Sequence, residues 1–395
     1  MPGGSTVRGL TLTHGNGATG GGLSVTSPGA TTVEGCVLTA NSAGAGGGLA
    51  AGPGTDVTVV DTEIRGNDAR TRGGGLLVGE GASVTLAGST VHDNLVPSGP
   101  GGGVALIGGT LTGGTVSHNA SDAVGIFVIG TCLGPGGGGI YAEGDSAVVG
   151  TEVSENTAMM GGGVLAAGGS LTLTDAALWG NTDGAVGGAG LMGCDADVTL
   201  AGSTEVHDND ALGQAGGVWL SGGSLTGGVV RDNTAGDWGG GVSAYQAALV
   251  GVDIRTNHAG FGGGGASIGE STVTGCTFTA NDAPRGAGVF VAGDGGVSSR
   301  LEDTLLLDHL GGDGPALVAN HADVALVGVT ALRNTADAGS GAIAVQAGAT
   351  VHAEACDLGT GADGNLPADV ATRGGAYAFP GADRAFDCTA DACTE

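Results

Sequence analysis

A glycine triplet followed by an aliphatic residue recurs through this sequence at a nearly constant interval. Six close copies begin at Gly20, Gly46, Gly73, Gly101, Gly137 and Gly161. An asparagine stands a few residues before nearly every copy, and successive asparagines are mostly 24 to 28 residues apart. A fixed period of this size predicts the stacked coils of a solenoid.

Each repeat also contains three short runs in which apolar and polar residues alternate. Examples are Leu76-Leu77-Val78 after the glycines, Val84-Thr85-Leu86 in the second run and Ile64-Arg65-Gly66-Asn67 in the third. Runs with a period of two predict strands, and no helical stripe competes with them. Strands this short are stable only when the next repeat pairs with them. We therefore predict an all-β, right-handed, three-faced parallel β-helix of about 14 coils.

The recurring asparagines predict a ladder at one corner of the solenoid. We expect their side chains to turn inward and to bond to the corner backbone and to one another. The glycines then supply the positive φ angles and the close backbone approach of a sharp corner. The expected ladder comprises Asn41, Asn67, Asn94, Asn119, Asn156, Asn181, Asn209, Asn233, Asn257, Asn281 and Asn334, with Asn16 in a similar position relative to its glycines.

The period also predicts the domain organisation. Repeats occupy residues 1–352, with an insert at 120–135, and a C-terminal cap-like segment occupies 353–395. Val7 to Leu12 already has the pattern of a coil interior. Since terminal repeats need caps, we expect the native protein to have an N-terminal cap that this sequence lacks.

Composition narrows the range of partners. The chain has 11 basic residues against 39 acidic ones, for a formal net charge of −28. This charge repels nucleic acid and anionic lipid, so neither is an expected partner. The sequence has no run of 18 apolar residues and therefore no predicted transmembrane segment.

Several repeats resemble those of bacterial surface proteins. Gly161–Val164 and Phe278-Thr279-Ala280-Asn281 are similar to the GG-aliphatic and FxxN repeats of polymorphic outer-membrane proteins, although most third runs here have Val, Ile or Leu in place of Phe. The segment from Cys356 to Val370, with Cys388 and Cys393, resembles the ending of secreted β-helix proteins of myxobacterial type. The resemblance implies a β-helix that is exported and displayed outside the cytoplasm. It implies little about activity, because this fold includes lyases, hydrolases, adhesins and inert rods.

Charged residues on the third run are the candidates for catalysis. The candidate residues are Glu205, His207, Asp208, Arg231, Asp232 and Arg255. Glycoside hydrolysis needs two carboxylates about 5–9.5 Å apart, and Asp208 and Asp232 hold equivalent positions in consecutive repeats. The competing interpretation, which we favour, is a solvated ladder of alternating charges.

A second feature is a stripe of large side chains in the middle of the first run. These residues are expected to point outward, as a surface for ligands or as a face covered by another segment or subunit. The ligand-binding candidates are Tyr141, Leu165, Met192 and Trp219 on the stripe, and Trp238 and Phe261 at the corner. Because the insert's Val124–Ile129 is strongly apolar, we predict that it lies on this stripe and that Cys132 pairs with Cys194. A second disulfide is expected between Cys388 and Cys393.

Threonines and acidic residues suggest two weaker alternatives. Most second runs contain a threonine, which predicts one column of ordinary strand residues rather than the paired columns of ice-binding solenoids. Asp357, Asp363 and Asp369, near Asn365, are typical of turn capping, with a single Ca²⁺ ion as the alternative. No other metal or cofactor is expected.

These observations favour a non-enzymatic extracellular or cell-surface solenoid with a structural or adhesive role, carbohydrate binding being one form of adhesion. The expected partner is a glycan or a cell-surface protein. The alternative is a carbohydrate-active enzyme, either a glycoside hydrolase or a polysaccharide lyase. An enzyme would need convergent carboxylates with perturbed pKa values in a groove.

Overall fold

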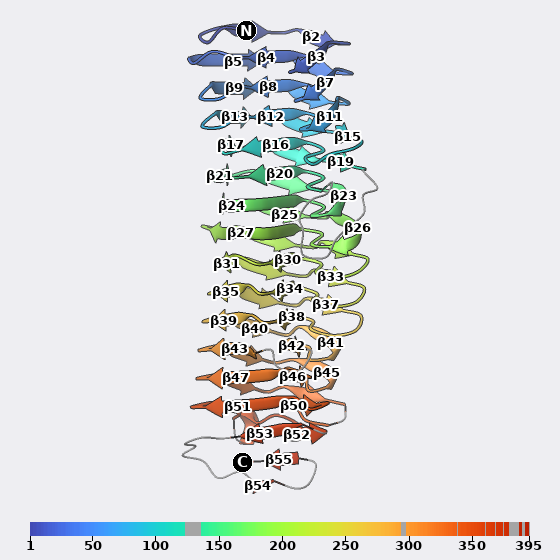
Figure 1. Ribbon diagram of the computed structural model, residues 1–395, viewed down its shortest axis with the longest axis vertical. Coiled ribbons are helices and arrows are strands. Elements are labelled where there is room, and N and C mark those ends of the chain that lie inside the picture. Colours follow the sequence, from blue (N-terminus) through green and yellow to red (C-terminus); the bar gives the residue numbers. More distant parts are fainter. Residues whose placement is uncertain are drawn as a thin grey trace. The chain divides into compact units, whose positions relative to one another are not determined.

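The computed structural model describes residues 1–122, 136–293, 298–337, 339–359, 361–367, 369–373, 375–378, 387–388 and 392–394. Its internal contacts divide the chain into two compact units, residues 1–210 and 211–395. Each unit is built from parallel strands in coils (Figure 1).

Every complete coil of the first unit contributes to four stacks of strands. The first stack, after the glycine corner, consists of β4 (Leu23–Val25), β8 (Leu49–Ala51), β12 (Leu76–Val78), β16 (Val104–Ile107) and β20 (Ile140–Glu143). The second consists of β1 (Thr6–Arg8), β5 (Ala30–Glu34), β9 (Asp56–Val60), β13 (Ser83–Ala87), β17 (Thr110–Thr112) and β21 (Ser146–Val149). The long strands β24 (Val164–Thr174) and β27 (Leu191–Ala201) run through both stacks and join them into one sheet.

The other two stacks of this unit form separate sheets. The third stack, which ends before the asparagines, consists of β2 (Thr11–Thr13), β6 (Val37–Thr39), β10 (Glu63–Arg65), β14 (Thr90–His92), β18 (Thr115–Ser117), β22 (Glu152–Ser154), β25 (Ala177–Trp179) and β28 (Glu205–His207). The fourth consists of β3 (Asn16–Thr19), β7 (Ser42–Ala45), β11 (Asp68–Arg72), β15 (Leu95–Val96), β19 (Ala120–Ser121), β23 (Thr157–Met160) and β26 (Thr182–Gly187), and β29 (Asp210–Ala211) lies at the unit boundary.

The second unit repeats this arrangement. Its first stack consists of β30 (Val218–Ser221), β34 (Val242–Tyr245), β38 (Ala266–Gly269), β42 (Val289–Ala292), β46 (Leu317–Asn320), β50 (Ile343–Gln346) and β52 (Val370–Arg373). The second consists of β31 (Ser224–Thr226), β35 (Ala248–Val250), β39 (Thr272–Thr274), β43 (Ser298–Glu302), β47 (Asp323–Val327), β51 (Thr350–Glu354) and β53 (Ala376–Ala378). The third consists of β32 (Val229–Arg231), β36 (Asp253–Arg255), β40 (Thr277–Thr279), β44 (Leu305–Leu307) and β48 (Thr330–Leu332). The fourth consists of β33 (Thr234–Ala235), β37 (His258–Ala259), β41 (Asp282–Arg285), β45 (Leu310–Asp313) and β49 (Thr335–Ala336).

The predicted all-β parallel solenoid with three sheets is confirmed, but the faces are composed differently. The first and second runs of each repeat lie in one sheet, and the third run forms a second sheet. The remaining sheet is the fourth stack, which the sequence pattern did not predict. Its strands, such as Ser42-Ala43-Gly44-Ala45, follow the asparagine and consist mainly of small residues. Without large apolar residues in alternation, such a strand forms only because its neighbours pair with it.

Apolar residues of the third stack fill the bore of each unit. The apolar residues three positions before the ladder asparagines are fully buried: Leu38, Ile64, Val91, Val153, Leu178, Val206, Ile254 and Phe278. In the described chain the helical content is one 3-10 turn, η1 (Gly361–Asp363), and no helix is long and apolar enough to span a membrane.

The asparagine ladder is present, and all eleven predicted asparagines are buried. Asn94 is representative: its Oδ1 accepts hydrogen bonds from the backbone N–H and the Nδ2 of Asn67, both at 3.0 Å. Its own Nδ2 donates to the carbonyl oxygen of Ile64 at 2.9 Å and to Oδ1 of Asn119 at 3.0 Å. Asn16 is an exception, since it is exposed and Gly15 holds the equivalent position, donating its N–H to Asn41 Oδ1.

Glycine is required at the opposite end of the fourth stack because consecutive coils touch there through their backbones. A Cβ atom on Gly74 would lie 2.3 Å from the carbonyl oxygen of Gly102 in the next coil. Gly73 beside it has a φ angle of +64°. The glycine triplet therefore serves both the turn and the stacking of coils.

The residue before each ladder position adopts the left-handed conformation, whether or not it is glycine. Ala40 before Asn41 has a φ angle of 53°, and Gly66 before Asn67 has a φ angle of 58°. An L-residue in this conformation costs roughly 1–2 kcal/mol.

We expect Ala40→Gly to raise the free energy of unfolding by about 1 kcal/mol, because glycine relieves this strain. The reciprocal change, Gly66→Ala, is expected to lower it by a similar amount, since a Cβ at Gly66 meets only Thr39 Oγ1 at 3.6 Å. The free energy of unfolding of each variant is measured by urea denaturation, monitored by circular dichroism. Equal midpoints for the two variants would contradict the interpretation.

Thr31 is a polar residue among the inward-facing side chains of the first unit. Thr31 lies beside Val57 in the inward row of the second stack and is almost fully buried. Among the described residues its Oγ1 has no hydrogen-bond partner. Burial of a hydroxyl without a partner costs roughly 1–3 kcal/mol.

We therefore expect Thr31→Val, which keeps the shape of the side chain, to raise the free energy of unfolding by about 1–2 kcal/mol. Thr32→Val, on the outward side of the same strand, is the matched control and should change little. Chemical denaturation of the three proteins provides the measurement. A destabilised Thr31→Val variant would show that the hydroxyl has a partner.

A second ladder lies at the corner between the second and third stacks. The backbone N–H of Cys36 donates to Thr62 Oγ1, and that of Thr62 donates to Ser89 Oγ, both at 3.1 Å. Cys36 and the equivalent Cys276 are buried free thiols. Burial raises the pKa of Cys276, so this position does not favour a reactive thiolate.

Parallel pairing in the second unit continues beyond residue 353. β52 pairs with β50 and β53 pairs with β51, whereas β54 (Asp387–Cys388) and β55 (Ala392–Thr394) pair antiparallel. Asn365 forms a ladder position, because its Oδ1 accepts from the Asn334 backbone N–H at 3.0 Å. The cap-like role of residues 353–395 stays a prediction.

Candidate functional site

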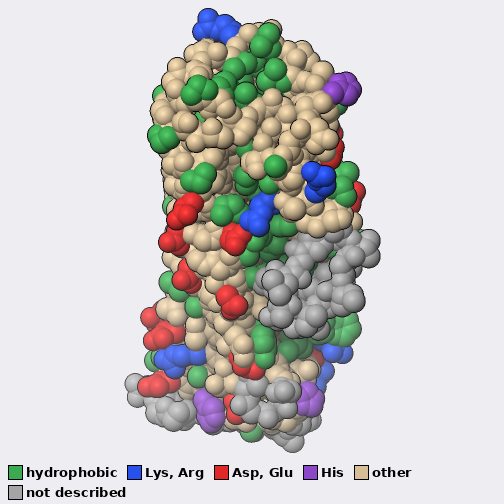
Figure 2. All heavy atoms as spheres, turned by 45° about the horizontal axis from the view of Figure 1, so that its top comes forward, with side chains coloured by type: hydrophobic (Ala, Val, Ile, Leu, Met, Phe, Trp, Pro, Cys, Tyr) green, Lys and Arg blue, Asp and Glu red, His purple; other side chains and the backbone are tan. Residues whose placement is uncertain are grey.

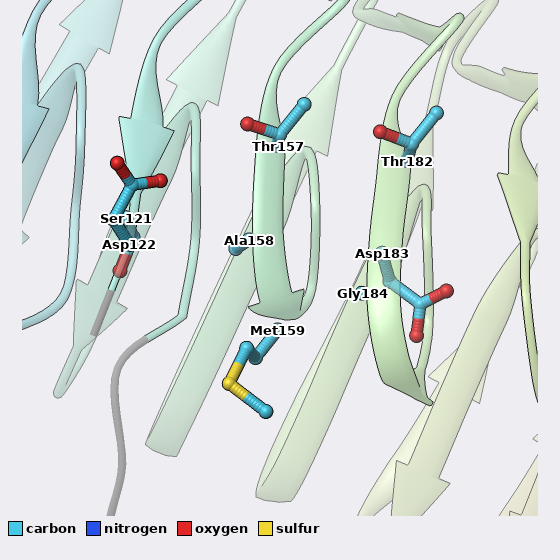
Figure 3. Close-up of a pocket in the computed structure, with 8 residues that line it drawn as sticks. All are labelled: Ser121, Asp122, Thr157, Ala158, Met159, Thr182, Asp183 and Gly184. Carbon is cyan, nitrogen blue, oxygen red and sulfur yellow. The ribbon is translucent and has the colours of Figure 1, made fainter. Parts of the chain in front are cut away.

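A cavity of about 250 Å³ lies on the fourth stack of the first unit, over β19, β23 and β26 (Figure 3). Thr157 and Thr182 hold matching places on neighbouring strands, as their register requires. The lining consists of Ser121, Asp122, Thr157, Ala158, Met159, Thr182, Asp183 and Gly184. The lining therefore combines hydroxyl groups, two carboxyl groups and a small apolar surface, and it contains no basic residue.

An irregularity in strand pairing shapes this cavity. Thr157 pairs with Thr182 and Ala158 with Asp183, but Met160 pairs with Gly187, so β26 contains additional residues at this point. An extra residue in one strand bends it away from its partner. The hollow is therefore a local consequence of the longer segment between Asn181 and the next glycine corner.

The sequence analysis did not identify the residues that line the cavity, although Asp183 departs from the repeat pattern. The second residue after the ladder asparagine is Ala43, Ala69, Val96, Ser121 and Ala158 in the preceding coils, and all are buried. Asp183 holds this position in its coil and is only 4% exposed. An acidic residue in a row of small buried residues marks the site.

The charged residues predicted on the third stack are paired locally. In the first unit, Glu205 and His207 lie on β28, and His207 Nδ1 is 2.7 Å from Asp208 Oδ2. In the second unit, Arg231 Nη1 is 2.6 Å from Asp232 Oδ2. Asp208 and Asp232 belong to different units, so the structure does not test the expected spacing of the two carboxylates.

The neighbouring coil of the second unit extends this pattern. Arg255 Nη1 lies 2.5 Å from Asp253 Oδ2, and Thr256 Oγ1 donates to Asp232 Oδ1 at 2.6 Å. Desolvation alone would raise the pKa of Asp232, but hydrogen bonds from Thr256 and Arg231 outweigh it and hold that pKa below its usual value. Asp232 is therefore ionised at neutral pH and does not carry the proton of a general acid.

Other carboxyl groups are shifted in the same direction. Hydrogen bonds from Ser203 lower the pKa of Asp175, and those from Gln246 and Tyr245 lower the pKa of Glu270. The hydrogen bond from Arg333 lowers the pKa of Asp308. These carboxyl groups are stabilised in the charged form by hydrogen-bond donors beside them. The face drawn in Figure 2 shows charged side chains scattered among backbone and small polar groups.

The predicted outward stripe exists in register, but much of it is buried. Tyr141 pairs with Leu165, and Leu165 with Met192. Tyr141 is half-buried, whereas Leu165 is 0% and Met192 1% exposed. Of the two alternatives for this stripe, the burial of Leu165 and Met192 favours a covered face over an open ligand surface. The glycine corners fold against this side of the strands: a Cβ on Gly136 would lie 2.7 Å from Leu165 Cδ2, and one on Gly188 would lie 3.1 Å from Met192 Cβ.

Tyr141 belongs to a small polar cluster. Its hydroxyl donates to Glu143 Oε2 at 3.4 Å, and Arg72 Nη1 pairs with the same oxygen at 3.0 Å. Desolvation and the nearby Glu143 raise the pKa of Tyr141. The cluster is a half-exposed ion pair with an aromatic neighbour.

In the second unit the corner aromatics contact one another. Trp219, half-buried on β30, pairs with Ser243. The Trp238 ring centroid lies 4.4 Å from that of Phe261 and 4.5 Å from that of Phe290, and the Arg285 guanidinium lies 5.1 Å from the Phe261 centroid. Phe261 is 44% exposed. Trp238 thus packs against Phe290 of the first stack and stays partly exposed beside Phe261.

The acidic residues near the C-terminus each have a protein partner. Asp357 Oδ1 accepts from the Gly359 N–H at 3.0 Å, Asp363 Oδ1 lies 3.5 Å from Arg333 Nη1, and Asp369 Oδ1 accepts from Asn365 Nδ2 at 3.2 Å. Across the described residues, no group of three His, Cys, Asp or Glu side chains gathers to hold a metal ion. A Ca²⁺ ion at this position stays a proposal.

The predicted disulfides fall largely outside the described residues. Cys194 is disulfide-bonded, but its predicted partner Cys132 and the apolar insert segment Val124–Ile129 lie outside the described residues. Cys388 and Cys393 face each other across the antiparallel β54–β55 pair, and their side chains are not described. Both pairings stay predictions.

The second-stack threonines form two columns rather than one. Thr58, Thr85 and Thr112 are in register, whereas Thr172 pairs with Thr199 in the adjacent outward column. Asp56 lies in that second column, beside Ser83. The columns are mixed in composition, as expected for ordinary outward strand residues.

Comparison with known proteins supports the fold and leaves the activity open. A family model described as a right handed beta helix region matches residues 3–158. This match agrees with the predicted right-handed winding. Searches of curated proteins and of solved structures gave no significant match.

Proposed function

We propose that the protein is a non-enzymatic β-solenoid displayed outside the cytoplasm, with a structural or adhesive role. The observation that carries this proposal is the local pairing of charges on the third stack. Arg231 with Asp232, Arg255 with Asp253 and His207 with Asp208 are partly exposed pairs within a single coil or strand. Exposed ion pairs of this kind contribute little to the free energy of folding, and they are typical of a surface without acid–base chemistry.

A glycosidase would require a different arrangement. Its general acid is a carboxyl group with a raised pKa, close to a second carboxylate. The carboxyl groups of Asp175, Asp232, Glu270 and Asp308 have pKa values shifted the opposite way. The lowered values favour a passive surface over a carbohydrate-active enzyme.

Charge also bears on the polysaccharide lyase alternative. Lyases that act on uronates bind a polyanion, but this chain has a net charge of −28 and no lysine. Long-range repulsion would oppose the approach of such a substrate. A neutral glycan or a cell-surface protein fits the charge better as a partner.

The first test is an assay for catalysis. The purified protein is incubated with neutral and uronate-containing polysaccharides, and reducing ends and unsaturated products are measured. We expect no release above the background of a heat-denatured sample. Release that is abolished by Asp232→Asn or Asp208→Asn would contradict the proposal and support the enzyme alternative.

The second test concerns location. Intact source cells are treated with a protease that does not enter them, and an antibody against the solenoid follows its loss. Cleavage on intact cells or recovery from the medium is expected. Protection until the cells are lysed would contradict display outside the cytoplasm.

A further inference from the structure

The first coil of the first unit leaves one side of β2 open (Figure 1). β2 pairs with β6, and no other strand of the described chain pairs with it. β4 in the same coil is partly covered, because the N-terminal ammonium of Met1 donates to the Ser24 carbonyl oxygen and the Met1 carbonyl oxygen accepts from the Thr26 N–H at 3.2 Å. An uncovered strand edge is a template for pairing with another chain.

The backbone groups of Thr11 and Thr13 are directed to this open side. The Leu10 carbonyl oxygen accepts a hydrogen bond from the Val37 N–H at 2.9 Å, so the backbone of Leu10 faces β6. Backbone groups of successive strand residues point to opposite sides, so Leu12 also faces β6, whereas Thr11 and Thr13 face away from it. Two identical residues therefore present N–H and carbonyl groups on either side of one leucine.

The end of the bore is also exposed on this side. Leu12 is aligned with Leu38 of the next coil, and Leu38 is aligned with Ile64. Leu38 and Ile64 are fully buried, whereas Leu12 is partly exposed and Leu10 beside it is 51% exposed. A strand added to the open side would cover Leu12 as the later coils cover its equivalents. This end of the unit thus combines unpaired backbone groups with apolar surface, as protein–protein interfaces do.

The distribution of charge favours a second copy of the chain as the occupant. The chain has 39 acidic residues and a net charge of −28, but the first acidic residue in the sequence is Glu34. Arg8 and His14 are the only charged or titratable side chains in residues 1–33. Two copies of so acidic a chain repel each other, and this repulsion is weakest where their N-terminal coils meet.

The two ends of the chain differ in how their edges are covered. In the second unit, β52 pairs with β50 on one side and with the antiparallel strand β55 on the other. Both sides of β52 are therefore occupied, whereas β2 has one side open. This difference favours contact between two N-terminal coils over contact between opposite ends.

We propose that two copies of this chain associate through β2, which pairs antiparallel with β2 of the other copy about a two-fold axis at Leu12. Thr11 of one copy then lies opposite Thr13 of the other, and their N–H and carbonyl groups form hydrogen bonds across the interface. Leu12 lies opposite its equivalent, and the two side chains close the bores of both first units. A two-fold contact uses the same surface on both copies, so association stops at the dimer. The proposal does not depend on whether the protein is an enzyme.

The test is sedimentation equilibrium of the full chain at micromolar concentrations, in low and in high salt. We expect a mass twice that of one chain, and salt should tighten the dimer because it screens the repulsion between the acidic copies. Thr11→Pro removes an N–H on the open side of β2 and is expected to raise the dissociation constant tenfold or more. Thr11→Val, which keeps this N–H, is the matched control and should dimerise like the parent protein.

Hydrogen exchange of the parent protein locates the contact. The amides of Thr11 and Thr13 should exchange at least tenfold more slowly in the dimer than in the diluted monomer, whereas the Leu38 amide should not change. A parent that stays monomeric, a dimer that Thr11→Pro retains, or a dimer in which both amides exchange as in the monomer would overturn the proposal. Oligomers that keep growing with concentration would also overturn it, since they require head-to-tail contact. If Thr11→Pro fails to fold, the exchange measurement on the parent protein decides.

Discussion

Lowering the pH from 7 to 4 is expected to reduce the free energy of unfolding of the second unit by about 3 kcal/mol through a single side chain, His309. His309 replaces asparagine in the ladder and is fully buried. Its ring Nδ1 accepts a hydrogen bond from the backbone N–H of Asn281 at 3.0 Å, and the backbone N–H of His309 donates to Asn334 Oδ1 at 3.0 Å. A ring that accepts at Nδ1 must be neutral.

The direction of the pH dependence follows from this burial. Desolvation lowers the pKa of His309 to about 4, although the nearby carboxylate of Asp308 acts in the opposite sense. An unfolded histidine has a pKa of about 6.5. The stability is therefore fully present above about pH 6.5 and is lost as the pH falls toward 4.

The variant His309→Asn isolates this effect from the titration of the many carboxyl groups. Asparagine restores the ladder residue of the other coils, and it has an Nδ2 donor like that of Asn281, which reaches the Ile254 carbonyl at 2.9 Å. Urea unfolding of both proteins at pH 7, 6, 5 and 4 gives the difference directly. A difference that stays constant across this range would contradict the assignment of a neutral buried imidazole.

Removal of one ladder asparagine from the first unit is the second change with a large expected effect. Asn94→Ala takes away the acceptor of the Asn67 backbone N–H and the donor to the Ile64 carbonyl. Both groups are buried, and each costs roughly 1–3 kcal/mol when its partner is lost. We expect the free energy of unfolding to fall by about 2–4 kcal/mol.

Thr90→Ala is the matched control for this experiment. It lies on β14 in the same coil, with its side chain directed outward, and should change the stability by less than about 0.5 kcal/mol. Denaturant unfolding and native-state hydrogen exchange of the Asn67 amide report the global and the local effect. Unchanged protection of that amide in Asn94→Ala would show that another group satisfies it.

The repeat pattern alone was sufficient to predict the solenoid. The period of the glycines and asparagines, the alternation in the first three runs and the apolar residues before each asparagine all depend on local rules of strand and turn formation. Cys36 and Cys276 stand where Thr62 and Ser89 recur in other repeats, and both are buried free thiols. Because each of these features recurs in many repeats, a substitution in one repeat leaves the pattern recognisable in the others.

Features that depend on contact between coils were not predictable in the same way. Alternation placed Leu165 and Met192 on the outer side of their strands, whereas their burial, with glycine corners lying against them, is visible only in the tertiary structure. The fourth stack has too few large residues to be read from its own sequence, and it forms because its neighbours pair with it. The cavity arises from one irregular pairing between β23 and β26, which breaks the repeat. Sequence periodicity thus determined which residues occupy each coil, whereas packing of successive coils determined which outward side chains stay open to solvent and where a hollow forms.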